Sequence, residues 1–107
     1  MTTKFKSFKN EEDVKRFFES RLSISVSTSS DVLSLLKELD LKRANQITRG
    51  EYPRDPNSVF NRYDLTIVSE APAAPTLLVF ANIWLLHFYF NGDKLAQISV
   101  NLSSIGL

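Results

Sequence analysis

TLLVFANIWLLHFYF, residues Thr76 to Phe90, is the most informative stretch of this 107-residue chain. It is rich in the β-branched and aromatic side chains that favour strands, and Asn91-Gly92 follows it directly. An Asn-Gly pair can supply the two positive-φ residues of a type I′ turn, so Leu95 to Leu102 is expected to return as a paired strand. The sequence therefore predicts a β-hairpin at the C-terminal end.

The charge-free run from Ala71 to Phe90 favours a sheet core over a membrane span. Its apolar content falls short of the roughly 20 residues that a spanning helix needs, and Asn82 and His87 lie near its middle. The first residues alternate lysines with phenylalanines and show no export signal. We expect a cytoplasmic protein without a membrane span, and a periplasmic location if an export signal has been removed.

Composition predicts one folded domain over residues 1–107. The hydrophobic fraction is 43% and the aromatic fraction 11%, which is typical of a globule with one core. The chain has no Cys, which excludes disulfides and thiolate nucleophiles. A net charge of +1 gives no drive toward nucleic acid. Within the domain we expect a tail at 1–9, a helical pair at 10–43 and an antiparallel sheet at 59–102.

The helical pair carries two helix-start signals. Asn10 can cap a helix from Glu11 to Arg21, and Thr28 with Asp31 resembles a capping box for a second helix that ends near Arg43. Each predicted helix has one apolar stripe at three- and four-residue spacing. The stripes consist of Val14, Phe17, Phe18 and Leu22, then Val32, Leu35, Leu36 and Leu39.

The remaining strand signals lie between the helices and the hairpin. Ala44 to Ser58 is expected to be a loop, although fifteen residues is long for a plain connection and favours a short extra strand or a functional loop. Val59 to Ser69 alternates as a half-buried strand that places Tyr63 on one face with Leu65 and Ile67, and Ala71 to Pro75 is expected to be a turn. The order predicts an α+β fold with two N-terminal helices packed on one face of a three- to four-stranded antiparallel meander.

This fold leaves one sheet face without an evident cover. Two helices can cover one face only, but the central strand is apolar on both. The uncovered side is predicted to carry Ile83, Leu85, His87 and Tyr89. It must meet the long loop, the N-terminal tail, a second copy or a partner protein.

Three segments carry a resemblance to a known arrangement: Val14–Phe18, Ser27–Leu36 and Phe88–Val100. They look like the paired helices and the final hairpin of the small outer-membrane lipoprotein family that includes SmpA, OmlA and BamE, and of the structurally similar β-lactamase inhibitor proteins. This chain has Ser27 where that family usually has Gly, and it has no lipid-bearing Cys. The resemblance implies a non-catalytic bacterial scaffold whose sheet face or loops grip another protein.

Candidate chemistry is sparse. His87 is the only histidine, and no acid, nucleophile or second metal ligand lies near it in the sequence. We expect a structural or interface histidine, with no catalytic residue, no metal and no cofactor. A second group mixes guanidinium and aromatic character around a Pro-containing loop, as protein interfaces do. It consists of Arg49, Tyr52, Arg54 and Arg62.

The leading hypothesis is a small non-enzymatic protein-interaction module, which self-associates as a homodimer or binds a protein partner through the apolar sheet face. One alternative is an immunity or inhibitor protein that neutralises a toxin or enzyme. Another is a small ligand-binding or catalytic domain whose pocket, between helices and sheet, is lined by Trp84, His87 and Tyr63.

Overall fold

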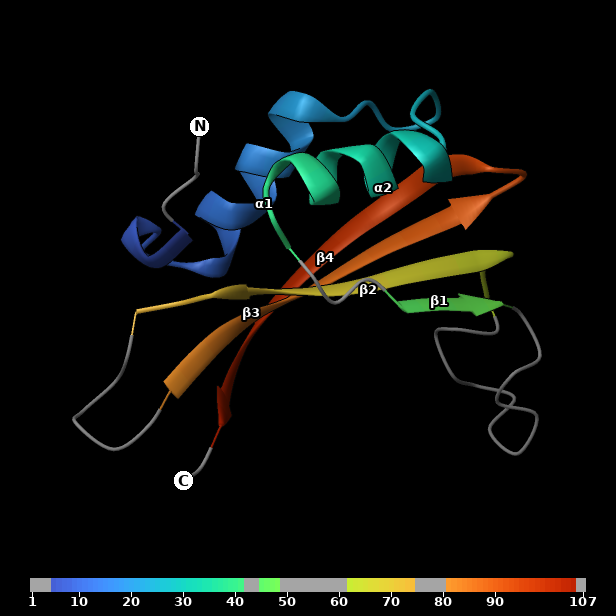
Figure 1. Cartoon of the computed structure of the whole chain (residues 1–107). Coiled ribbons are helices and arrows are strands. Elements are labelled where there is room, and N and C mark those ends of the chain that lie inside the picture. Colours follow the sequence, from blue (N-terminus) through green and yellow to red (C-terminus); the bar gives the residue numbers. More distant parts are fainter. Residues whose placement is uncertain (1–4, 42–44, 49–61, 75–80, 106–107) are drawn as a thin grey trace.

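The chain folds as two helices followed by a four-stranded sheet, and the computed structural model describes residues 5–41, 45–48, 62–74 and 81–105. A short 3₁₀ turn, η1 (Phe5–Ser7), precedes the helices α1 (Glu11–Arg21) and α2 (Ser29–Glu38). The strands are β1 (Asn45–Thr48), β2 (Leu65–Pro72), β3 (Ala81–Asn91) and β4 (Lys94–Ile105). Both helices lie on one side of the sheet (Figure 1), which confirms the predicted α+β class.

Helix α1 begins and ends where its sequence predicts. The Asn10 side chain accepts a hydrogen bond of 2.9 Å from the backbone N–H of Asp13, which satisfies one of the otherwise unpaired donors of the first turn. At the other end, the N–H of Leu22 donates to the carbonyl of Phe18 at 2.9 Å. Val14 and Phe18 are fully buried, so the predicted apolar stripe faces the sheet.

Helix α2 starts at the predicted capping box but ends earlier than predicted. Thr28 and Asp31 exchange side-chain and backbone hydrogen bonds in both directions. The helix stops at Glu38 because Asp40 adopts a left-handed φ of 60° and the N–H of Leu41 donates to the carbonyl of Leu36 at 2.9 Å. This Schellman-type ending terminates the helix, so the expectation that it continues to Arg43 was wrong.

The sheet is an antiparallel meander in the order β1-β2-β3-β4. The long stretch after the helices does contain a short extra strand, since β1 pairs with β2. Strand β2 begins at Leu65 and continues through Pro72, which the sequence had assigned to a turn. Pro72 lies opposite Ile83 at the end of the strand, where a residue without an N–H is tolerated. Residues 59–61 of the predicted strand lie outside the described residues.

The β3–β4 hairpin is present, with its turn one residue later than predicted. Asn91 pairs with Lys94, and the positive φ values belong to Gly92 (57°) and Asp93 (60°). Asp93 is held there by Ser29 at the start of α2, whose hydroxyl donates to its carboxylate at 2.6 Å. The Ser29 hydroxyl, followed by its backbone N–H, holds the pKa of Asp93 below its ordinary value. A tertiary contact therefore selects the turn position.

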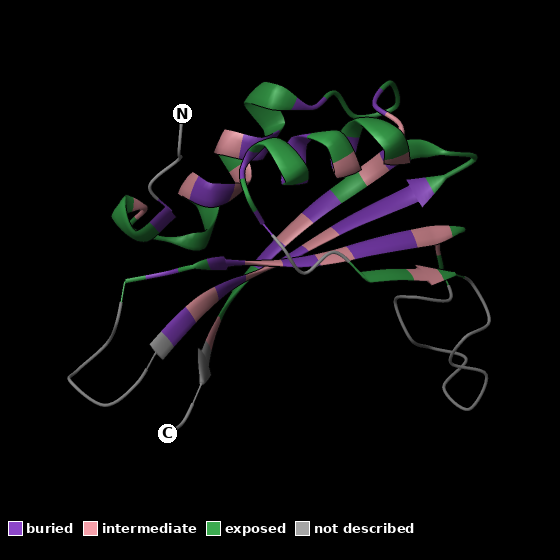
Figure 2. Ribbon diagram, viewed as in Figure 1, coloured by how far each residue is buried: buried purple, intermediate pink, exposed green. Residues whose placement is uncertain are grey.

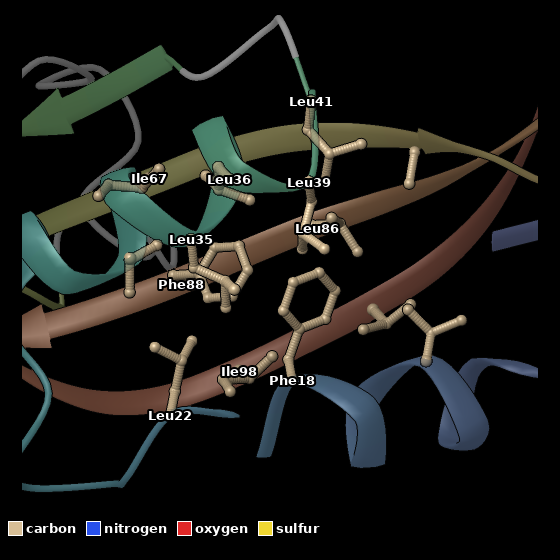
Figure 3. Close-up of a cluster of buried hydrophobic side chains, with 14 of the residues drawn as sticks. Phe18, Leu22, Leu35, Leu36, Leu39, Leu41, Ile67, Leu86, Phe88 and Ile98 are labelled. Carbon is tan, nitrogen blue, oxygen red and sulfur yellow. The ribbon is translucent and has the colours of Figure 1, made fainter. Parts of the chain in front are cut away.

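The core lies between the helices and one face of the sheet. Phe18 packs edge-on against Phe88, with ring centroids 5.2 Å apart. Figure 3 shows this pair together with side chains of α2 that point toward the same strands. In Figure 2 the outward sides of the helices are exposed, while the middle of the sheet is mostly buried. The core face of the central strand is built from Trp84, Leu86, Phe88 and Phe90.

Candidate interaction surface

The N-terminal tail does not cover the far side of the sheet. Phe5 is 2% exposed, and its ring lies 5.6 Å from that of Phe17 and 5.9 Å from that of Phe18. Its carbonyl accepts a hydrogen bond of 3.0 Å from the indole N–H of Trp84, a residue of the helix-facing side. The described part of the tail, residues 5–9, therefore belongs to the helical layer.

We call the side of the sheet turned away from the helices the open face. Strand residues point alternately to the two sides, and Trp84, Leu86, Phe88 and Phe90 occupy the core. The residues between them consequently lie on the open face, which brings together the four predicted site residues of β3: Ile83, Leu85, His87 and Tyr89. Three of these are partly exposed, and Tyr89 is 6% exposed.

The neighbouring strands give the open face an apolar centre and a polar border. The cross-strand register places Val68 beside His87 and Thr66 beside Tyr89, so the apolar strip of β3 extends onto β2. On the opposite flank, beyond Lys94 at the turn, β4 contributes uncharged polar side chains to this face. These are Gln97, Ser99, Asn101 and Ser103.

An aromatic cluster stiffens one end of the strip. The Tyr63 and Tyr89 rings stack with centroids 4.7 Å apart and an interplanar angle of 27°, and His87 lies nearly parallel to Tyr89 at 5.9 Å. The Tyr63 hydroxyl donates a 2.9 Å hydrogen bond to the side-chain oxygen of Gln97 on β4. The predicted pairing of Tyr63 with Leu65 and Ile67 was wrong, because residues 62–64 form a bend before β2 and the strand alternation starts only at Leu65.

Burial shifts the pKa values of His87 and Tyr89 in the directions that favour their uncharged forms. Desolvation lowers the pKa of His87 from its ordinary value of 6.5, so the imidazole is mostly neutral at pH 7. Desolvation, reinforced by the nearby Tyr63 phenol, raises the pKa of Tyr89, while a hydrogen bond with Ser99 opposes the rise. The described strands place two charged side chains on this face, Glu70 beside Leu85 and Lys94 beside Asn91 at the turn.

Within the described ranges, no group of three His, Cys, Asp or Glu side chains could hold a metal ion. Trp84 lies on the core face, whereas His87 and Tyr63 lie on the open face, so these three cannot line one pocket. The pocket alternative was therefore wrong for this set of residues.

The Arg-rich group is only partly visible. Arg62 is exposed at the bend that precedes β2. The other members, Arg49, Tyr52 and Arg54, lie outside the described residues. The part that can be placed therefore borders the aromatic cluster through the neighbouring Tyr63.

Sequence reasoning missed the contribution of Tyr63 and of β2 to this surface. The signal for β2 was available, because Thr66 and Val68 alternate with Leu65 and Ile67. No signal in the sequence could have predicted the Tyr63–Tyr89 stack, which depends on the bend.

No helix among the described residues is long and apolar enough to cross a membrane. Comparisons with protein-family models, with curated proteins and with solved structures give no match to this chain.

Proposed function

We propose that this protein is a small interaction module that associates with a second copy of itself through the open face. The observation that supports the proposal is the partly exposed strip of Ile83, Leu85 and His87 on the side opposite both helices. The described tail, which could have covered the strip, packs in the helical layer instead. Contiguous apolar surface of this kind commonly marks an interaction site.

The charge of the open face suits pairing with an identical surface. A twofold interface brings each patch against its own copy, so every charge near the axis meets a like charge. The centre of this face is aliphatic and aromatic, and its histidine is neutral at pH 7. Apart from Glu70, which lies beside Leu85, a second copy therefore meets little electrostatic repulsion there.

The test is Leu85→Glu, which places a carboxylate at the centre of the strip. The expected result is a solution mass, measured by light scattering, that falls to half the wild-type value. Val26→Glu is the matched control, because Val26 is 65% exposed on the connection between the helices and the change in chemistry and charge is the same. Equal masses for the wild type and Leu85→Glu would refute the proposal.

A further inference from the structure

Strand β4 is an edge strand of unusual length. It is the last strand in the sheet order and spans 12 residues, Lys94–Ile105, whereas typical strands have about 5–6. The outer side of an edge strand presents N–H and C=O groups that can pair with another strand. Native proteins usually block such edges with charge, proline, bulges or a covering segment.

In the part of the chain that the structure describes, the features that block the β4 edge lie at the N-terminal end of the strand. Lys94 supplies a charge, and a bulge between Tyr89 and Phe90 of β3 accommodates one extra residue of β4. The connection between the helices covers the edge at Leu95. There the N–H of Ser25 donates to the Leu95 carbonyl and the N–H of Leu95 donates to the Ser27 carbonyl, both at 2.7 Å.

The rest of the edge, residues 97–103, has none of these devices. It contains neither a charged residue nor a proline. In the described part of the chain, no further backbone segment bonds to this side of β4. Leu102, near its far end, is 48% exposed although it points to the helix side.

Helix α1 does not seal this part of the edge. A groove of about 210 Å³ lies between the helix and the strand. Its lining consists of Glu11, Glu12 and Lys15 from α1 and residues 97–100 from β4. Open space is therefore found beside the same stretch of strand that lacks a covering segment.

We propose that a second copy of this chain pairs with β4 edge to edge, antiparallel, about a twofold axis at Ser99. In this register the paired residues of the uncovered stretch 97–101 are chemically alike. Gln97 faces Asn101 of the other copy, amide against amide, and Ile98 faces Val100, aliphatic against aliphatic. The pairing ends before Leu95, whose N–H and C=O already bond to the connection between the helices.

This contact is separate from the face contact proposed above. An edge contact that continues the sheet has its twofold axis perpendicular to the sheet, whereas face packing has its axis parallel to the sheet. Two perpendicular twofold axes are compatible with a closed tetramer. The edge contact alone gives a continuous eight-stranded sheet whose two open faces lie on the same side.

A charge exchange at the paired amides tests the edge contact. Gln97 and Asn101 are both exposed, so substitution there leaves the core intact, although Gln97→Lys also removes the acceptor of the Tyr63 hydroxyl on the open face. The double variant Gln97→Lys/Asn101→Lys places ammonium groups opposite one another twice in each dimer, and its mass is expected to fall to half. The double variant Gln97→Glu/Asn101→Lys makes the same pairs attractive, and its mass is expected to return to the starting value.

The solution mass of each double variant is measured in the Leu85→Glu background and in the otherwise wild-type chain. This comparison separates the two interfaces. Because Gln97 and Asn101 also border the open face, the deciding comparison is made in the Leu85→Glu background. Loss of mass in the Lys/Lys variant with recovery in the Glu/Lys variant in that background supports edge pairing in this register. Equal masses for the two double variants overturn it, whatever Leu85→Glu does. Conversely, an unchanged mass in Leu85→Glu refutes the face contact, and the two double variants still test the edge contact. Far-ultraviolet circular dichroism confirms that each variant is folded.

Discussion

Burial of His87 makes the free energy of unfolding depend on pH. Burial lowers its pKa in the folded chain below the ordinary value of 6.5, so the unfolded chain binds the proton more readily. The contribution of His87 to stability is therefore complete above about pH 6.5 and is lost as the pH falls through the lower folded value. Burial raises the pKa of Tyr89, which is stacked beside His87, so Tyr89 adds no slope in this range.

The expected outcome is that His87→Gln flattens the fall in unfolding free energy between about pH 7 and pH 5.5, where an ordinary histidine takes up its proton. Urea unfolding at several pH values, on the wild type and the variant side by side, measures it. The two proteins share every other titratable group, so the difference between their slopes isolates His87. Identical slopes in the two proteins would contradict the burial argument.

Thr66 offers a second test at the scale of one residue. It is fully buried on the open face, and its hydroxyl has no hydrogen-bond partner among the described residues. Valine has the same shape without the hydroxyl and favours strands, so Thr66→Val should raise the unfolding free energy by about 1 kcal/mol. Ser99→Ala is the contrast, because the Ser99 hydroxyl bonds to Tyr89 and its loss should lower stability. Destabilisation by both changes would show that Thr66 is satisfied.

At the scale of one element, the capping box of α2 can be measured. The Thr28 hydroxyl accepts from the N–H of Asp31, while the Asp31 carboxylate accepts from the N–H of Thr28. Thr28→Ala removes one half of this exchange and should cost about 1 kcal/mol of unfolding free energy, seen in denaturant titration. Ser30→Ala, an exposed change in the same turn, is the control and should cost nothing. Equal effects would mean that the cap contributes little.

The elements that the sequence predicted well are those whose signals are local. Asn10 and Thr28 mark helix starts through bonds three residues away, so both starts were confirmed. The end of α2 and the turn of the hairpin depend instead on left-handed residues, Asp40 and Asp93. Aspartate is compatible with a left-handed φ but does not require it, and the turn position also depends on Ser29, which is distant in sequence. Local patterns could not have predicted either.

The same distinction applies to the open face. Strict alternation in β3 predicted that Ile83, Leu85, His87 and Tyr89 share a side, since only the strand geometry is involved. The position of Phe5 could not be predicted, because its carbonyl accepts a hydrogen bond from Trp84, which lies 79 residues away in the sequence. A run of tail residues carries no periodicity that would indicate which layer it joins.

For the whole molecule, self-association couples stability to concentration. A native state that associates is favoured by mass action, whereas the unfolded chain is not, so the melting temperature of an associating chain rises with its concentration. For a domain of this size, a dimer should gain roughly 3–5 °C for each tenfold increase. The wild type is expected to show this rise in scanning calorimetry.

The variants divide the concentration dependence between the two proposed interfaces. Leu85→Glu should retain part of the rise, because edge pairing at Gln97 and Asn101 persists. Adding Gln97→Lys/Asn101→Lys should remove the remainder, since a monomer melts at one temperature at every concentration. Val26→Glu is the control for the face contact only, because Val26 lies between Ser25 and Ser27, whose backbone bonds to Leu95 at the β4 edge. A melting temperature of the wild type that does not change over a hundredfold range of concentration would contradict both interfaces together, and the open face would then need another partner.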